Sequence, residues 1–166
     1  MTTSMNYTLY LIRHSYAENP NDKSDFERSL TLEGQSNVRA LGRYLINKKF
    51  DPDRILCSSS RRTMETAINL VEELEMNEQN ISYHDKIYEA SVRELLEVVN
   101  HIDSSSKSIA LIGHNPTITF FGEYLTGASI GNMQPCSIVT IRFEKTSWSD
   151  ISQGSGLFIS YYHPTH

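Results

Sequence analysis

Two short apolar runs, about a hundred residues apart, each end in a histidine, and this repeated pattern constrains the fold more than any other feature. The runs are residues 9–14 (LYLIRH) and residues 109–114 (IALIGH). Short runs of this kind are typical of strands buried on both faces of a sheet. Each run therefore predicts a buried strand that delivers one imidazole to the edge of a sheet.

Strand-like and helix-like segments alternate along the rest of the chain. Spacing of the apolar residues predicts helices over 31–48, 61–74, 91–101 and 117–125, and strands over 8–13, 54–57, 81–83, 108–112, 137–143 and 156–162. Thr31 is the expected N-cap of the first helix. The last two strands are expected to form an antiparallel pair, joined by the polar loop 146–155. The aromatic residues Phe158, Tyr161 and Tyr162 are expected to belong to this strand and to the core.

The order of these segments predicts an α/β fold of three layers, in which helices cover both faces of a mostly parallel sheet. A length of 166 residues favours one domain that spans residues 1–166. The composition, 39% hydrophobic and 21% charged, is that of an ordinary globular protein. Cys57 and Cys136 lack metal-ligand spacing, so we expect them to be small buried side chains in a reducing compartment.

Charge and hydropathy exclude several classes of partner. The net charge is −5, and no run of basic residues is present, which argues against nucleic acid and against an anionic membrane surface. No apolar stretch approaches the roughly 20 residues needed to span a bilayer. The first six residues are short and polar, with no secretory apolar region. We therefore expect a cytoplasmic protein.

The two histidines acquire a chemical meaning from the arginines near them. In parallel sheets, ligands bind outside the carboxyl ends of the strands, where His14 and His114 would meet if their strands are neighbours. Arg13 and Arg62 offer the fork-shaped donors that suit a phosphoryl group with about two negative charges. A neutral histidine can attack phosphorus and carry the group covalently, without a metal. The pattern predicts a phosphate site with a histidine nucleophile.

At these residues the chain resembles the histidine phosphatase superfamily, which has a phosphoglycerate mutase-like fold. The resemblance is carried by Arg13-His14, by the stretch 58–66 and by Gly113-His114. Residues 25–34 (DFERSLTLEG) and 87–91 (IYEAS) are similar to stretches of the SixA-like phosphohistidine phosphatase branch. The matches run in order from about Leu9 to Pro116. The C-terminal third carries no matching motif.

The resemblance implies roles for four residues. His14 would be the nucleophile, Arg13 and Arg62 would clamp the phosphate, and His114 would complete the pocket. It also implies catalysis without a metal ion or an organic cofactor. Two positions depart from the family pattern: Ser15 stands where glycine is usual, and Ser59 stands where proline is usual.

Three further residues are candidates for substrate binding. Ser58 either hydrogen-bonds a catalytic arginine or imidazole, or caps the helix that begins near Arg61. Arg28 either reaches the phosphate or a phosphoprotein surface, or is solvated. Asn115 stands near a helix start, where free backbone N–H groups could face the phosphate.

The leaving group separates the possible substrates. A phosphomonoester leaves as an alkoxide and needs an acid, for which Glu89 is the best candidate, although a carboxylate near a helix start has a structural explanation as well. A phosphohistidine leaves as imidazole, which is protonated readily near pH 7. The short chain lacks the long insertions that roof the pocket in larger members of the superfamily, and an open site suits a phosphohistidine on a protein surface.

Three functions follow from this chemistry. The leading hypothesis is a metal-independent phosphohistidine phosphatase, acting on a phosphorylated protein such as a phosphotransfer domain in signalling or sugar uptake, and releasing inorganic phosphate. The first alternative is a small-molecule phosphomonoesterase with Glu89 as acid, while a mutase fits so short a chain less well. The second alternative is a phosphoprotein-binding module without turnover, which the departure at Ser15 leaves open.

Overall fold

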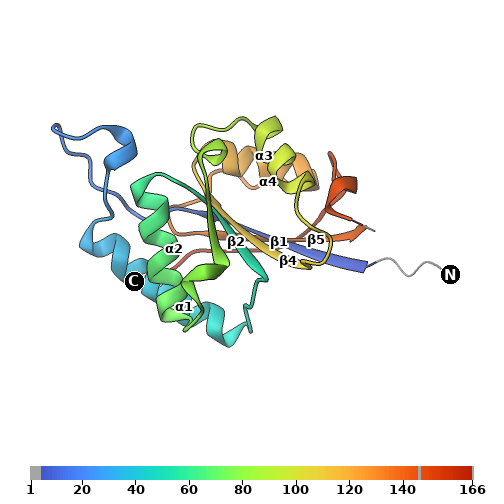
Figure 1. The fold of residues 1–166 in the computed structure, drawn as a ribbon, viewed down its shortest axis with the longest axis horizontal. Helices are drawn as coiled ribbons and strands as arrows, with labels where there is room; N and C mark the ends of the chain where they lie inside the picture. Colours follow the sequence, from blue (N-terminus) through green and yellow to red (C-terminus); the bar gives the residue numbers. More distant parts are fainter. Residues whose placement is uncertain (1–4, 146, 166) are drawn as a thin grey trace.

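The computed structural model describes residues 5–145 and 147–165, which form a sheet with helices on both faces (Figure 1). The strands are β1 (Met5–Arg13), β2 (Arg54–Ser58), β3 (Ile81–His84), β4 (Ser108–Gly113), β5 (Ile138–Lys145) and β6 (Leu157–Tyr162). The helices are α1 (Leu32–Asn47), α2 (Arg61–Glu73), α3 (Val92–Asn100) and α4 (Thr117–Thr126). Short 3-10 turns are η1 (Asp25–Glu27), η2 (Glu78–Asn80), η3 (Asp85–Ile87) and η4 (Trp148–Asp150). Each predicted helix and strand is present, within a few residues of its expected ends.

The strand order brings the two histidine-bearing segments together. The order across the sheet is β3-β2-β4-β1-β5-β6, and β1 and β4 are parallel neighbours with Arg13 opposite Gly113. β2 lies parallel to β4 on its other side. Because these three strands run in one direction, their carboxyl ends meet at one edge of the sheet. His14 and His114 are the next residues along the chain, so the predicted convergence of the two motifs depends on this register.

Helices cover both faces of the sheet, as the alternating pattern predicted, and the structure places two on each face (Figure 1). Figure 1 places α1 and α2 on one face and α3 and α4 on the other. The first pair buries apolar side chains against the sheet, among them Val38, Leu41, Leu45, Leu70 and Val71. The second pair does the same with Leu95, Val99, Phe121 and Leu125. The two clusters make a three-layer α/β structure, which confirms the predicted fold class.

Local capping fixes where two of the helices begin. The hydroxyl of Thr31 accepts a hydrogen bond of 2.9 Å from the N–H of Gly34, which confirms the predicted N-cap of α1. Ser91 and Glu94 form a reciprocal capping box at the start of α3. These caps satisfy N–H groups that a helix start otherwise leaves without partners.

The C-terminal strands extend the sheet in the antiparallel sense. β5 pairs with β1, and β6 pairs with β5, as predicted. β6 lies at the edge of the sheet. Phe158 on this strand is 40% exposed, so the prediction that Phe158 belongs to the core is wrong. An edge strand has no neighbour on one side, and Phe158 therefore keeps solvent contact. Tyr162 instead stacks on Tyr44 of α1, with the ring centroids 3.5 Å apart.

The loop between β5 and β6 lies away from the histidines. Within its described residues, Trp148 is fully buried, its ring packs on Tyr7 and Phe143, and its Nε1 donates to the carbonyl of Ser106 at 2.6 Å. Tyr7 stands near the start of β1, whereas His14 follows the end of β1. The loop therefore anchors the opposite end of the sheet from the predicted site.

Two other expectations concern the cysteines and the membrane. Cys57 and Cys136 are both buried and unbridged, in agreement with a structural role in the core. None of the helices within residues 5–145 and 147–165 is long and apolar enough to cross a lipid bilayer.

Candidate phosphate-binding site

The histidines His14 and His114 lie side by side at the carboxyl edge of the sheet. Their ring centroids are 5.3 Å apart. Ser58 stands at the end of β2, beside β4, and Arg62 stands in the first turn of α2 that follows. The fold therefore brings together four of the predicted site residues from segments that are far apart along the chain: His14, Ser58, Arg62 and His114.

The hydrogen bonds of His14 define which ring nitrogen is available for chemistry. Nδ1 lies 2.7 Å from the carbonyl oxygen of Ser15, which can only accept, so Nδ1 carries the proton. Nε2 carries the lone pair of the ring, and this lone pair accepts a hydrogen bond of 3.3 Å from Nε of Arg62. Burial, together with the charges of His114, Arg62 and Arg13, lowers the pKa of His14 to about 3. His14 is therefore neutral near pH 7, as a nucleophile requires.

Arg62 is the central donor of the site, and its side chain is only 7% exposed. Besides His14, it contacts His114, whose Nδ1 lies 3.2 Å from Nη2. Asp25 of η1 holds the other end of the guanidinium. The backbone oxygen of Asp25 accepts from Nη1 at 2.7 Å, and its carboxylate Oδ2 accepts from Nη2 at 3.0 Å. A buried arginine of this kind is paired and fixed in direction before any anion arrives.

His114 is held from both sides. Because Arg62 can only donate, Nδ1 of His114 accepts, and the proton of the neutral ring lies on Nε2. Nε2 then donates to the hydroxyl of Ser58 at 2.8 Å. Burial and the charge of Arg62 lower the pKa of His114 to about 4. Of the two interpretations of Ser58, the structure favours the contact with an imidazole, since Ser60 occupies the N-cap position of α2.

Arg13 ends β1, directly before His14, and part of its guanidinium has no hydrogen-bond partner among the described residues. Nη1 donates to the carbonyl of Met133 at 2.7 Å, while the buried Nε has no hydrogen-bond partner among the described residues. Burial lowers the pKa of Arg13, and the charge of Arg13 contributes to the lowered pKa of His14, the next residue along the chain. An arginine with a buried, unpaired donor is suited to receive an anion.

The other proposed residues lie around this centre. Arg28 donates from Nε to the backbone oxygen of Glu18 at 2.7 Å and from Nη1 to Asp25 at 3.0 Å, so its contacts lie on the loop before α1. The side-chain amide of Asn115 donates to Asn132 and to the carbonyl of Met133. Both side chains therefore organise loops next to the site, and direct binding of substrate by either one stays a prediction.

Glu89 shares a cavity with Arg62 and His114. This cavity has a volume of about 280 Å³, and its walls include Arg62, His114, Asn115 and Glu89. Glu89 is exposed and has a positive φ of 56°, which is uncommon for a residue with a side chain. Its position agrees with a role at the mouth of the site, and its role as an acid remains a proposal.

Sequence reasoning gave no role to Asp25 or Tyr88, which the structure places in the same cavity. The hydroxyl of Tyr88 donates to Oδ2 of Asp25 at 2.8 Å, and the ring of Tyr88 packs edge-on against His114. Both residues belong to the two stretches that resemble the SixA-like branch. That resemblance was the available signal, but it could not say what the side chains contact.

The departures from the family pattern have local explanations. Ser15 is fully buried, and its hydroxyl donates to the carbonyl of Gly34 at 2.7 Å while its N–H donates to Thr66 at 3.1 Å. The extra hydroxyl is thus accommodated by a backbone carbonyl of α1. Ser59 hydrogen-bonds Asp85 at the start of η3, which ties the end of β2 to this turn.

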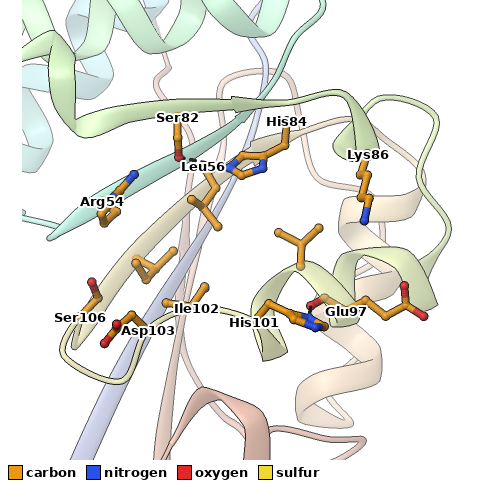
Figure 2. Close-up of a pocket in the computed structure, with 12 residues that line it drawn as sticks. Arg54, Leu56, Ser82, His84, Lys86, Glu97, His101, Ile102, Asp103 and Ser106 are labelled. Atoms are coloured by element: carbon orange, nitrogen blue, oxygen red, sulfur yellow. Dashed lines mark hydrogen bonds between the residues drawn. The ribbon is translucent and has the colours of Figure 1, made fainter.

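A second, larger cavity of about 370 Å³ lies between α3 and the neighbouring strands (Figure 2). Figure 2 shows Arg54 and His84 on the strands, Glu97 on α3 and His101 directly after the end of α3, around a floor that includes Leu56. None of the proposed site residues is among the described residues that line it. The phosphate site and this cavity are therefore separate features.

Comparison with known proteins identifies the family to which this geometry belongs. The family model of the histidine phosphatase superfamily (branch 1) matches residues 9–95, more than half of the chain. The chain belongs to the histidine phosphatase superfamily. The match includes His14, Arg62 and Glu89, whereas His114 lies beyond its end.

Similar proteins agree with this assignment. An uncharacterised protein of Mycobacterium tuberculosis is 20% identical over 162 residues, which cover 92% of this chain and 99% of the relative. Among solved structures, a candidate phosphohistidine phosphatase SixA from Nakamurella multipartitia has a TM-score of 0.83 at 22% identity, covering 99% of this chain and all of that one. The protein histidine phosphatase SixA in complex with tungstate has a TM-score of 0.78 at 19% identity, covering 94% and 96%. These likenesses show that the chain has the fold of the SixA-like branch.

Proposed function

We propose that this protein is a metal-independent phosphatase that works through a phosphohistidine on His14, with protein phosphohistidine as its substrate. One observation carries the proposal. The Nε2 lone pair of His14 faces the donors of Arg62, while Nδ1 is tied to the carbonyl of Ser15. A nucleophile and an anion-binding donor set therefore meet at one point, as phosphoryl transfer requires.

The first chemical step forms one bond and breaks one. Nε2 of His14 attacks phosphorus, the bond from phosphorus to the leaving nitrogen breaks, and the leaving imidazole takes up a proton from water. Arg62 and Arg13 face the oxygens of the transferred group, where negative charge must be stabilised. The phosphorylated ring of His14 acquires a positive charge. The hydrogen bond that Nδ1–H donates to the carbonyl of Ser15 stabilises this charge.

The second step returns the enzyme to its starting form. Water attacks phosphorus, the bond to Nε2 of His14 breaks, and inorganic phosphate leaves. His14 regains its lone pair without a net change in its protonation. Nδ1 of His114, which lies 3.2 Å from Nη2 of Arg62, becomes a donor to the equatorial oxygens once it takes up a proton beside the negatively charged phosphoryl group.

A phosphohistidine fits this site because its leaving group needs no dedicated acid. The fold likeness to SixA-type proteins supports the same choice. The alternative of a small-molecule phosphomonoesterase rests on a specific observation, which is that Glu89 lines the same cavity as Arg62 and His114. A binding module without turnover is the third possibility, and it would use the same anion donors.

The decisive experiment measures phosphate release from a phosphohistidine phosphotransfer protein and from a panel of phosphomonoesters, with wild type and His14→Ala. Turnover of the phosphoprotein alone, abolished in the variant, supports the proposal. Broad turnover of monoesters would transfer the assignment to the esterase. If wild type binds phosphate but never forms an acid-labile phosphoenzyme, the enzymatic proposal fails and the binding module remains.

A further inference from the structure

Arg62 has two edges that can each make a pair of hydrogen bonds, and the structure assigns them to different partners. The end of the guanidinium, Nη1 and Nη2, is held by the backbone oxygen and the carboxylate of Asp25. The side edge, Nε and Nη2, points to His14 at 3.3 Å and to His114 at 3.2 Å. Because a guanidinium is rigid and planar, fixing one edge also fixes the direction of the other.

Asp25 is itself held in place by two further donors. Arg28 donates to Oδ1 at 3.0 Å, and the hydroxyl of Tyr88 donates to Oδ2 at 2.8 Å. Burial would raise the pKa of Asp25, but hydrogen bonds from Tyr88 and Arg28 and the charge of Arg62 outweigh it and hold that pKa at about 2. The carboxylate is therefore ionised throughout the physiological range.

We propose that Asp25 is a positioning residue for the reaction, which grips the far end of Arg62 so that its Nε/Nη2 edge faces the phosphoryl group between His14 and His114. This inference rests on the function proposed above. It gives a physical role to the segment DFER at residues 25–28, in which Arg28 acts on the site through its hydrogen bond to Asp25.

The charge balance of the segment agrees with this role. A lone carboxylate beside a phosphate site would repel the substrate, since like charges a few ångströms apart oppose each other. Arg28 lies three residues after Asp25 and neutralises the carboxylate within the same turn. Both carboxylate oxygens are occupied by donors, so Asp25 is not placed to act as an acid on a leaving group.

The test is a double-mutant cycle that compares Asp25→Ala in the wild-type and Arg62→Ala backgrounds. Misplacing a transition-state donor by about 1 Å costs on the order of 100-fold, so Asp25→Ala should lower kcat by about 10- to 100-fold in the wild-type background. The change in KM should stay below about threefold, because a correctly directed donor contributes more to the transition state than to the bound ground state. In the Arg62→Ala background, Asp25→Ala should have almost no effect, because the residue acts through Arg62.

Two further variants separate positioning from a merely structural effect. Asp25→Asn keeps the shape and one acceptor, and it should rescue part of the lost kcat. Glu27→Ala removes an acidic side chain from the same turn, and no hydrogen bond or ion pair of the Glu27 carboxylate occurs among the described residues. This control should retain wild-type kcat, and circular dichroism should show the same melting temperature for all variants to within a few degrees.

The outcomes distinguish this inference from the proposed function. Equal losses in both backgrounds would mean that Asp25 acts directly on substrate, and an unchanged kcat in Asp25→Ala would mean that it does not position Arg62. Either result overturns the inference while the phosphatase stands.

If wild type turns over none of the substrates, the same cycle is measured by binding of orthovanadate, which mimics the transition state, and of inorganic phosphate. Asp25→Ala should weaken vanadate by about tenfold and phosphate by less than about threefold, again only when Arg62 is present. Equal effects on the two anions, or no binding of either by wild type, would overturn the inference.

Discussion

Nε of Arg62 lies 3.3 Å from Nε2 of His14, so that the main anion donor of the site and its candidate nucleophile face each other directly. Arg62 is buried and His14 is held from behind by the carbonyl of Ser15. A phosphoryl group in contact with Nε2 of His14 would therefore also contact the guanidinium of Arg62. The closeness of these two atoms is the geometric basis of the predictions that follow.

Replacement of Arg62 by lysine should abolish most of the activity although the positive charge is kept. A lysine cannot contact His14, His114 and Asp25 together, because it lacks the planar fork. We expect kcat to fall by about 100- to 1,000-fold, the loss typical of a missing oxyanion donor. Arg61→Lys is the matched control, since Arg61 is more than half exposed and pairs only with Glu65 among the described residues. Equal activity of the two variants would contradict the assignment of Arg62.

The stability of the protein should decrease as the pH falls below about 6.5, the pKa of histidine in an unfolded chain. The pKa of His14 is about 3 in the folded state, so between these values the unfolded chain binds the proton and the folded chain does not. Stability therefore rises with pH across this window and is lost as the pH falls. Urea midpoints at pH 7 and pH 5 measure the difference, which should shrink in His14→Asn. His101 is exposed, so the control variant His101→Asn should keep the wild-type difference between the two urea midpoints. If His14→Asn also keeps that difference, the prediction is refuted.

Ser15→Ala should affect stability more than chemistry. The variant loses a buried hydrogen bond to Gly34 but keeps the backbone carbonyl that orients His14. The expected cost is about 1 kcal/mol of unfolding free energy, with kcat within about threefold of wild type because the imidazole keeps its partner. Chemical denaturation and steady-state kinetics on one preparation test both parts. A large loss of kcat at unchanged stability would show that Ser15 has a direct catalytic role.

Glu89→Gln distinguishes the two candidate substrate classes. An alkoxide leaving group needs a proton from an acid, and loss of that acid typically costs about 100- to 10,000-fold. An imidazole leaving group needs no such acid, so turnover of a phosphohistidine protein should remain within about threefold of wild type. Parallel assays of the variant on a phosphoprotein and on a phosphomonoester give the answer. Loss of activity on the phosphoprotein would count against the proposed substrate.

Much of the fold followed from patterns that a linear sequence contains. Apolar periodicity located each helix and strand, and Thr31 marked a helix start, because these signals depend on neighbours within a few residues. The exposure of Phe158 did not follow, because position at the edge of a sheet depends on which strands pair. The same limit applies to Asp25 and Tyr88, whose contacts link residues 63 positions apart.

The sequence by itself determined the chemical groups of the site and the elements that carry them: two histidines after buried strands, and an arginine in the first turn of a helix. Only the tertiary structure decided how they are directed, through the register of β1 against β4 and through the carboxylate of Asp25 at the far end of Arg62. The physical reason is that residue types and local periodicity reflect short-range preferences. The direction of a guanidinium or the tautomer of an imidazole depends on hydrogen bonds that form only after distant segments have packed together.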